Sequence, residues 1–352
     1  MNIVELLNQL NFTTLFLIFI VSKLFIETYL KTRNIKSINE NKEKIPERFT
    51  DVVTDEEYKK SINYNIERIR FSILTSVFGV GVLLFFTIGG ILNNLTVFVQ
   101  AITASNILGA ILLGLLLIVI GEIIEIPLAV YSTFYIEEKY GFNKTTTKTF
   151  VTDLFKNLLI QSIFSSILYA IVISIIENLG NNWWIFAFVA VFLLQLVIFY
   201  IYPVLILPLF NKFEPLEDEK FKEPIERLLK KIKFKAKGLF VMDGSLRSSH
   251  GNAFFTGFGS NKRIVFYDTL LETITPDEME SILGHELGHY KLGHIKKTLI
   301  SSIFFGFAGF YILGQVFQSE NFFYGHGLDE LTVYSKFLLF YLVVGSYTFF
   351  TK

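Results

Sequence analysis

The 352-residue sequence contains no cysteine. This absence excludes disulfide bonds, thiolate metal ligands and a cysteine nucleophile, and it leaves the redox compartment undetermined. Histidine is also scarce, with five in the whole chain. Any metal ion must therefore be held by a few histidines or by carboxylates.

Charge is scarce as well. Only 18% of the residues are Asp, Glu, Lys or Arg, and 32 basic residues balance 32 acidic ones to a formal net charge of +0. A chain without excess positive charge lacks the electrostatic footprint of nucleic-acid binding, so no nucleic-acid partner is expected. Hydrophobic residues make up 52% of the chain, and the mean hydropathy is +0.49. These values indicate a protein of the lipid bilayer.

The hydrophobic residues gather in long charge-poor segments. A membrane-spanning helix needs about 20 predominantly apolar residues. Seven spans are predicted: Asn11–Leu30, two within Phe71–Gly121, Asn157–Ile176, one within Asn178–Asn211, Thr298–Ser319 and Phe337–Thr351. We expect Asn93, Asn94 and the polar residues after them to form the turn between the second and third spans. The sequence thus predicts a mainly α-helical, polytopic seven-helix membrane protein.

Basic residues in the connections orient these spans. Lys and Arg are concentrated in the connections after the first, third and fifth spans and are nearly missing from the others. Basic loops stay on the cytoplasmic side, so the amino terminus is expected outside. The membrane would be that of the endoplasmic reticulum in a eukaryote, or the inner or plasma membrane in a bacterium.

Three regions follow from this pattern. Residues 1–210 carry the first five spans with their loops, residues 211–297 form a small cytoplasmic α+β region, and residues 298–352 carry the last two spans. The middle region is expected to begin with a helix at Asp218–Lys233 and a strand at Gly238–Met242. A hairpin should follow, with strands Ala253–Phe258 and Arg263–Tyr267 and the turn Gly259–Lys262. A last helix should start at Thr275, which caps it, with Pro276 and Glu278 in its first turn.

The capped helix leads into the segment Gly284-His285-Glu286-Leu287-Gly288-His289. On a helix, two histidines four residues apart share a face and can bind one zinc ion. Glu286 lies beside them, where it can take a proton from a zinc-bound water. A bare match of this length also arises by chance, as two surface histidines on a helix. Its place on a capped helix in the only sizeable soluble region favours a catalytic site.

Two further histidines are weighed against this motif. His294 follows His289 by five residues of the helix, which places it roughly 140° around the axis from His289, off the ligand face. It is therefore expected to support the site from outside or to lie on the surface. His250 precedes the predicted hairpin, where it is either an ordinary loop residue or a group near the substrate.

Several stretches together resemble a known family, the CAAX prenyl proteases of the Ste24 type. The stretches are PLAVYSTFYIEEKYGFN (Pro127–Asn143), PLFNKFEP (Pro208–Pro215), RSSHGNAFFTGFGSNKRIVFYDTLL (Arg247–Leu271) and HELGHYKLGH (His285–His294). The related HtpX type shares the zinc helix, but five spans before His285 argue against it. The resemblance covers nearly the whole chain and is much more specific than the zinc motif alone.

The resemblance implies a chamber enclosed by the seven helices and a Zn²⁺ cofactor bound by His285 and His289. It implies cleavage near a carboxyl-terminal prenylated cysteine, with peptide or prenylated protein as the partner in the bilayer. It also suggests that Asn252, Ala253, Phe254 and Phe255 hold the substrate backbone by edge pairing. Asn252 alternatively serves only as a turn residue.

The sequence departs from the family pattern at its carboxyl end. The family takes its third zinc ligand from a glutamate after the seventh span, and the sequence ends at Lys352, beside that span. Glu320, Asp329 and Glu330 are expected across the membrane from the zinc helix and are not expected to replace that ligand. Two hypotheses therefore stand, an active zinc endopeptidase and, alternatively, a truncated, catalytically silent membrane protein that binds peptide or lipid in its chamber.

Overall fold

The computed structural model describes residues 3–43, 45–232, 234, 237–256 and 262–348. The described chain divides into two compact units. One comprises the described residues of Met1–Ile136, Gln161–Ala187 and Tyr311–Lys352, and the other those of Glu137–Ile160 and Phe188–Phe310.

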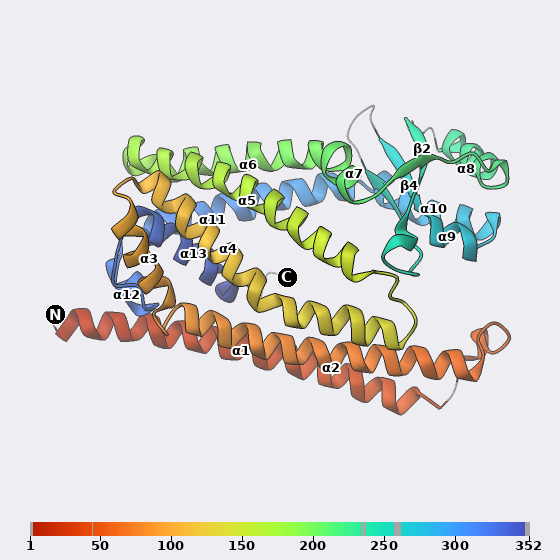
Figure 1. Ribbon diagram of the computed structural model, residues 1–352, viewed down its shortest axis with the longest axis horizontal. Coiled ribbons are helices and arrows are strands. Elements are labelled where there is room, and N and C mark those ends of the chain that lie inside the picture. Colours follow the sequence, from red (N-terminus) through yellow and green to blue (C-terminus); the bar gives the residue numbers. More distant parts are fainter. Residues whose placement is uncertain (1–2, 44, 233, 235–236, 257–261, 349–352) are drawn as a thin grey trace. The chain divides into compact units, whose positions relative to one another are not determined.

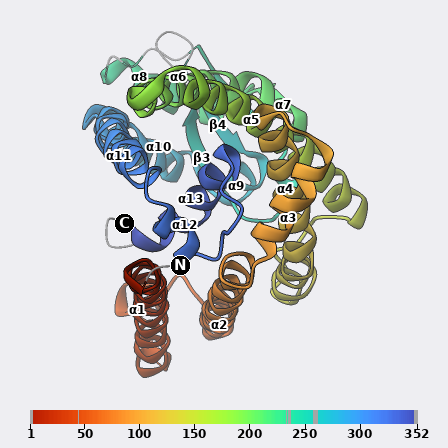
Figure 2. The same ribbon diagram turned by 90° about the vertical axis from the view of Figure 1, so that its left-hand side faces the viewer.

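The first unit is built from helices. They are α1 (Ile3–Asn41), α2 (Asp55–Phe86), α3 (Ile91–Ile102), α4 (Asn106–Tyr131), the later part of α5 (Thr147–Asn178), α12 (Glu320–Gly325) and α13 (Val333–Tyr347). Helices α1 and α2 run side by side (Figure 1), and α12 packs against α1 (Figure 2). Short 3-10 or π-helical turns lie at Glu47–Phe49, Ser132–Glu137 and Gly180–Asn182.

Two glycines let α4 pack closely against its neighbours. A Cβ atom at Gly109 would come within 2.6 Å of the Tyr334 ring of α13, and one at Gly114 within 2.0 Å of the Tyr169 ring of α5. Small residues at helix contacts are a common means of close packing within a membrane. These glycines therefore fix the approach of α5 and α13 to α4.

Six helical segments of the described chain are long and apolar enough to cross a membrane. They are Asn11–Asn41, Asp55–Phe86, Asn106–Glu137, Thr147–Asn178, Gly180–Phe210 and Pro276–Val316. The predicted seventh span appears as α13, whose 15 residues make a shorter apolar helix. The prediction of a mainly helical, polytopic membrane protein is confirmed.

The predicted turn at Asn93 and Asn94 is wrong. Both residues lie inside α3, and the chain turns instead before Ile91 and again between Ile102 and Asn106. Asn93 is polar for another reason, because its side-chain oxygen accepts hydrogen bonds from the backbone N–H groups of Asp329 and Glu330, each at 2.9 Å.

The second unit combines helices with a four-stranded sheet. Its other helices are most of α6 (Trp183–Ile201), α7 (Leu207–Phe210), α8 (Glu219–Lys231), α9 (Asp268–Thr273), α10 (Pro276–Lys291) and most of α11 (His294–Val316), with short turns at Tyr202–Ile206 and Gly244–Leu246. The strands are β1 (Phe213–Pro215), β2 (Gly238–Met242), β3 (Ala253–Thr256) and β4 (Arg263–Tyr267), in the spatial order β1-β2-β4-β3. Strands β2 and β4 are parallel, and the other two pairs are antiparallel.

The predicted elements of residues 211–297 are thus found. Strand β2 has the predicted bounds, α8 begins one residue after its cap Asp218, and β3 pairs with β4 as the predicted hairpin. The predicted turn was Gly259–Lys262, and all of it except Lys262 lies outside the described residues.

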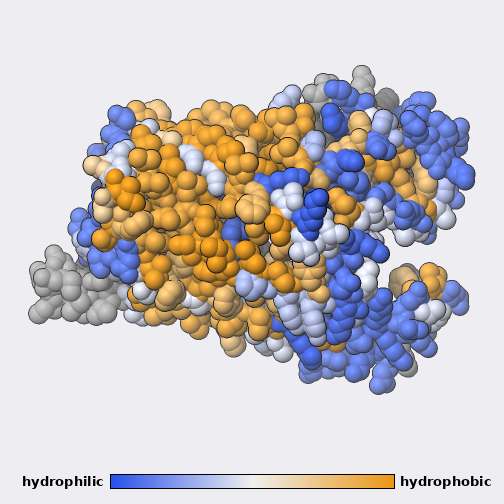
Figure 3. Space-filling model, in the orientation of Figure 1, coloured by the Kyte–Doolittle hydropathy of each residue, from blue (hydrophilic) through white to orange (hydrophobic). Residues whose placement is uncertain are grey.

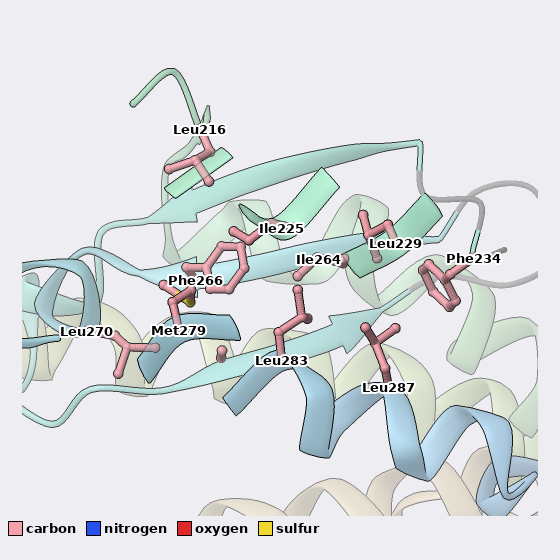
Figure 4. Packing of buried hydrophobic residues seen from close by; sticks show 11 residues of the cluster. Leu216, Ile225, Leu229, Phe234, Ile264, Phe266, Leu270, Met279, Leu283 and Leu287 are labelled. Carbon is pink, nitrogen blue, oxygen red and sulfur yellow. The ribbon is translucent and has the colours of Figure 1, made fainter. Parts of the chain in front are cut away.

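The core of this unit lies between the sheet, α8 and α10. Ile264 and Phe266 of β4 point to one face because side chains alternate along a strand. Figure 4 shows them packed against Ile225 of α8 and against Met279 and Leu283 of α10. All five side chains are buried. The core therefore fixes the position of α10 on the sheet.

The surface of the long helices differs in hydropathy from that of α8 and of the connection between α1 and α2. In Figure 3, hydrophobic residues cover most of the surface of the long helices, whereas hydrophilic residues cover α8 and the connection between α1 and α2. The apolar helix surfaces include exposed Phe25, Phe155 and Phe304. Such surfaces match a lipid environment.

Candidate metal centre

Helix α10 begins with the predicted capping box. The backbone N–H and the hydroxyl of Thr275 donate to the Glu278 carboxylate at 2.8 and 2.9 Å, and the Glu278 N–H donates to the Thr275 hydroxyl at 3.3 Å. The hydrogen bond from the Thr275 backbone N–H lowers the pKa of the Glu278 carboxyl most, and the bond from the Thr275 hydroxyl lowers it further. Pro276 at the first helical position has no N–H to leave unpaired. The local sequence thus fixes where the helix starts.

The two faces of α10 have different environments. Met279, Leu283 and Leu287 recur every fourth residue and are 0%, 1% and 3% exposed against the sheet (Figure 4). His285 lies two residues beyond Leu283, which is about 200° around the helix. His285 and His289 are accordingly exposed, and Glu286 is half-buried. Packing of Met279, Leu283 and Leu287 against the sheet therefore turns His285 and His289 away from the core.

The two imidazoles converge on one point. Nε2 of His285 lies 3.2 Å from Nε2 of His289, with the ring centroids 4.8 Å apart and the rings nearly perpendicular at 86°. A tetrahedral zinc ion with bonds of about 2.0–2.1 Å places two nitrogen ligands about 3.3 Å apart. The pair therefore fits a zinc ion. Within the part of the chain that the structure describes, no group of three or more His, Cys, Asp or Glu side chains is arranged to hold a metal.

His294 lies closer to the motif than predicted. Helix α10 ends at Lys291, and Gly293 has a φ of +68° before α11 begins at His294. The predicted offset of about 140° assumed a continuous helix and is wrong. The break brings Nδ1 of His294 to 2.7 Å from Nδ1 of His289. Glycine just past a helix end is a known termination signal, so the sequence contained the information needed to predict the break.

Strand β3 lies beside this helix at the end of the sheet. It pairs with β4 along one side and, among the described strands, has no partner along the other. Ala253 is buried in the core, Phe254 meets the Tyr267 ring edge-on, and Phe255 packs on Phe234. The second edge of β3 is thus available for an added strand.

Asn252 ends the ladder between β3 and β4. Its carbonyl accepts a hydrogen bond from the Tyr267 N–H at 2.9 Å, and its side-chain oxygen accepts one from the Ala253 N–H at 2.8 Å. The backbone carbonyl and the side-chain oxygen of Asn252 are thus both engaged at the start of β3.

The segment before Asn252 is attached to residues 137–145, which precede α5, and to the first turns of α5. Asn143 forms an isolated bridge with Ser248, and the His250 ring stacks on Phe142 at 4.3 Å, with Nε2 3.4 Å from the Glu137 carboxylate. Arg247 adds a bidentate ion pair with Asp153 of α5, at 2.6 and 3.0 Å. Sequence analysis missed this ion pair, because nothing local connects two residues 94 positions apart.

Comparison with known proteins gives a consistent result. Residues 34–212 match the family described as CAAX prenyl protease N-terminal, five membrane helices, and residues 215–349 match Peptidase family M48. A CAAX prenyl protease 1 homolog of Arabidopsis thaliana is 34% identical over 92% of this chain and 77% of its own length. CAAX prenyl protease 1 of Saccharomyces cerevisiae is 33% identical over 89% of this chain and 72% of its own length. The crystal structure of S. mikatae Ste24p superposes with a TM-score of 0.87 at 28% identity, covering 97% of this chain and 82% of that one.

Proposed function

The chain belongs to the M48 peptidases with a CAAX prenyl protease amino-terminal domain, and we propose that it is a zinc endopeptidase that cleaves membrane-associated, carboxyl-terminally prenylated substrates. One observation carries the proposal. The exposed face of α10 presents two imidazole nitrogens 3.2 Å apart, and Glu286, which directly follows the first histidine, carries a carboxylate.

His285 and His289 would hold the zinc through their Nε2 atoms. Zinc bound there would supply Lewis acidity, lowering the pKa of a bound water and polarising the scissile carbonyl. Glu286 takes the proton from the attacking water and then gives it to the amine of the departing peptide. The buried Leu283 and Leu287 hold these side chains in place by anchoring the opposite face of the helix.

Strand β3 would bind the substrate backbone. An extended peptide can add to its open edge by main-chain hydrogen bonds, which do not depend on the peptide sequence. Asn252 shapes the entry to this edge, and Ala253, Phe254 and Phe255 form it. A prenyl group on the substrate would remain among the apolar helices. The membrane environment and the similarity to CAAX prenyl proteases support this substrate class.

The basic connections support a cytoplasmic location for residues 211–297. The zinc helix would then act on substrates at the cytoplasmic face of the membrane.

Purified chain in detergent, incubated with a farnesylated CAAX peptide and with its unprenylated counterpart, tests the proposal. Glu286→Gln should lower turnover by about 10²–10⁴-fold, because it removes the proton acceptor while leaving both zinc ligands. His285→Ala should lose zinc and activity together. Cleavage that Glu286→Gln leaves unchanged would contradict the mechanism. Wild-type chain that binds zinc without cleaving either peptide would favour the catalytically silent alternative.

A further inference from the structure

We propose that His294 is a positioning residue for the metal ligand His289. It accepts a hydrogen bond from Nδ1 of His289 and so fixes the ring in the one form that leaves Nε2 free for the metal. The inference rests on the proposed function, since it concerns the same zinc ion. His294 lies outside the motif of His285, Glu286 and His289.

The geometry places three imidazoles in a row. Nε2 of His289 faces Nε2 of His285 at 3.2 Å, and Nδ1 of His289 faces Nδ1 of His294 at 2.7 Å. Both nitrogens of His289 are therefore engaged on opposite sides of its ring. The centroids of His289 and His294 are 4.8 Å apart at 65°, so the rings meet edge to face rather than stacked.

Proton accounting then fixes the roles. A neutral imidazole has one N–H, and a nitrogen that binds a metal carries no proton. When Nε2 of His289 is the ligand, its proton must be on Nδ1, which donates to Nδ1 of His294. His294 must then carry its own proton on Nε2. Hydrogen bonds from the second nitrogen of a ligand histidine orient the ring, and their loss typically costs 10–100-fold in metal affinity.

The backbone is built to bring His294 to this place. The left-handed φ of Gly293 interrupts the helix after α10, and α11 begins at the next residue, where the Lys297 N–H donates to the Gly293 carbonyl at 3.1 Å. A side chain at Gly293 would be strained in this conformation, although there is open space around it. His294 is half-buried as the first residue of α11. Its ring is therefore positioned by a helix rather than by a loop.

Zinc affinity of the full chain, measured in detergent by competition with a chelator, tests the inference. His294→Asn keeps an acceptor oxygen three bonds from Cα, where His has Nδ1, whereas His294→Leu removes the acceptor. We expect zinc affinity to fall about 10–100-fold in His294→Leu and to be largely restored in His294→Asn. His294→Met repeats the test with a flexible side chain if the leucine variant folds poorly.

The outcomes separate this inference from the proposed function. His294→Leu or His294→Met binding zinc as tightly as the wild type, while His285→Ala loses it, would overturn the role of His294 alone. Equal losses in the leucine and asparagine variants would also overturn it, because the acceptor would then be irrelevant. A wild-type chain that binds no zinc would refute the proposed metal centre, and the role of His294 with it.

Discussion

Arg247 should stabilise the attachment of the 247–252 segment to α5, and Arg247→Met tests how strongly. Besides the bidentate pair with Asp153, its guanidinium donates to the Asn211 side chain at 2.9 Å and to the Phe210 carbonyl at 2.8 Å. Its own carbonyl accepts bonds from Lys144 N–H and the Thr145 hydroxyl, both at 3.0 Å. One side chain thus connects three segments distant in sequence.

The size of the effect follows from burial. Exposed ion pairs contribute at most about 1 kcal/mol, whereas removing one partner of a buried pair costs about 3–5 kcal/mol. The Arg247 and Asp153 side chains are 26% and 19% exposed, between these limits and nearer the buried one. We therefore expect Arg247→Met to cost about 2–3 kcal/mol. This corresponds to a fall in Tm of about 5 °C.

A double-mutant cycle in detergent decides whether the pair itself is responsible. Arg247→Met, Asp153→Asn and the double variant are compared by Tm, and the double variant should be little less stable than the worse single one. The exposed pair of Lys222 and Glu219, at 3.0 Å, is the matched control, and Glu219→Gln should change Tm by less than about 2 °C. Additive losses at Arg247 and Asp153 would refute the coupling.

Three further predictions follow from features of α10 and from the membrane orientation. Leu283→Ala should cost about 2–5 kcal/mol by leaving a cavity under the zinc helix, and thermal unfolding together with zinc content would show it; an unchanged Tm would contradict the packing. Because the pKa of Glu278 is lowered, its capping bonds stabilise the fold above the ordinary carboxyl pKa, and this stabilisation is lost as pH falls through the lowered pKa. When the free energy of unfolding is measured against pH, Glu278→Gln should therefore lose less stability on acidification than the wild type. Lys237→Cys, on this cysteine-free background, should react with an impermeant thiol reagent only from the cytoplasmic side; labelling from outside would reverse the proposed orientation.

Much of the structure of residues 211–297 could be predicted because its signals are local. Thr275, Pro276 and Glu278 mark a helix start within four residues, and the β-branched and aromatic residues from Arg263 to Tyr267 mark a strand. Hydrophobic length alone was sufficient to find the long helices. These patterns depend on the backbone's immediate neighbours, which the sequence displays directly.

The misses come from contacts that the local sequence does not display. Asn93 was taken for a turn residue because its partners, 236 and 237 residues away, are invisible in a window of sequence. The order of the strands, with β4 between β2 and β3, follows from the parallel pairing of β2 with β4, which no local pattern displays. The position of His294 was missed because the helix breaks at Gly293, which has a left-handed φ of +68°.

The short connection between α10 and α11 joins the histidine motif directly to a candidate membrane span. Only Leu292 and Gly293 separate the zinc helix from an apolar helix of 23 residues, whose first residue is His294. Membrane helices tilt when hydrocarbon thickness changes, at modest energetic cost. A tilt of α11 would move its first ring relative to His289. Lipid chain length is therefore expected to affect the proposed metal centre, and zinc affinity measured in thin and in thick bilayers should differ.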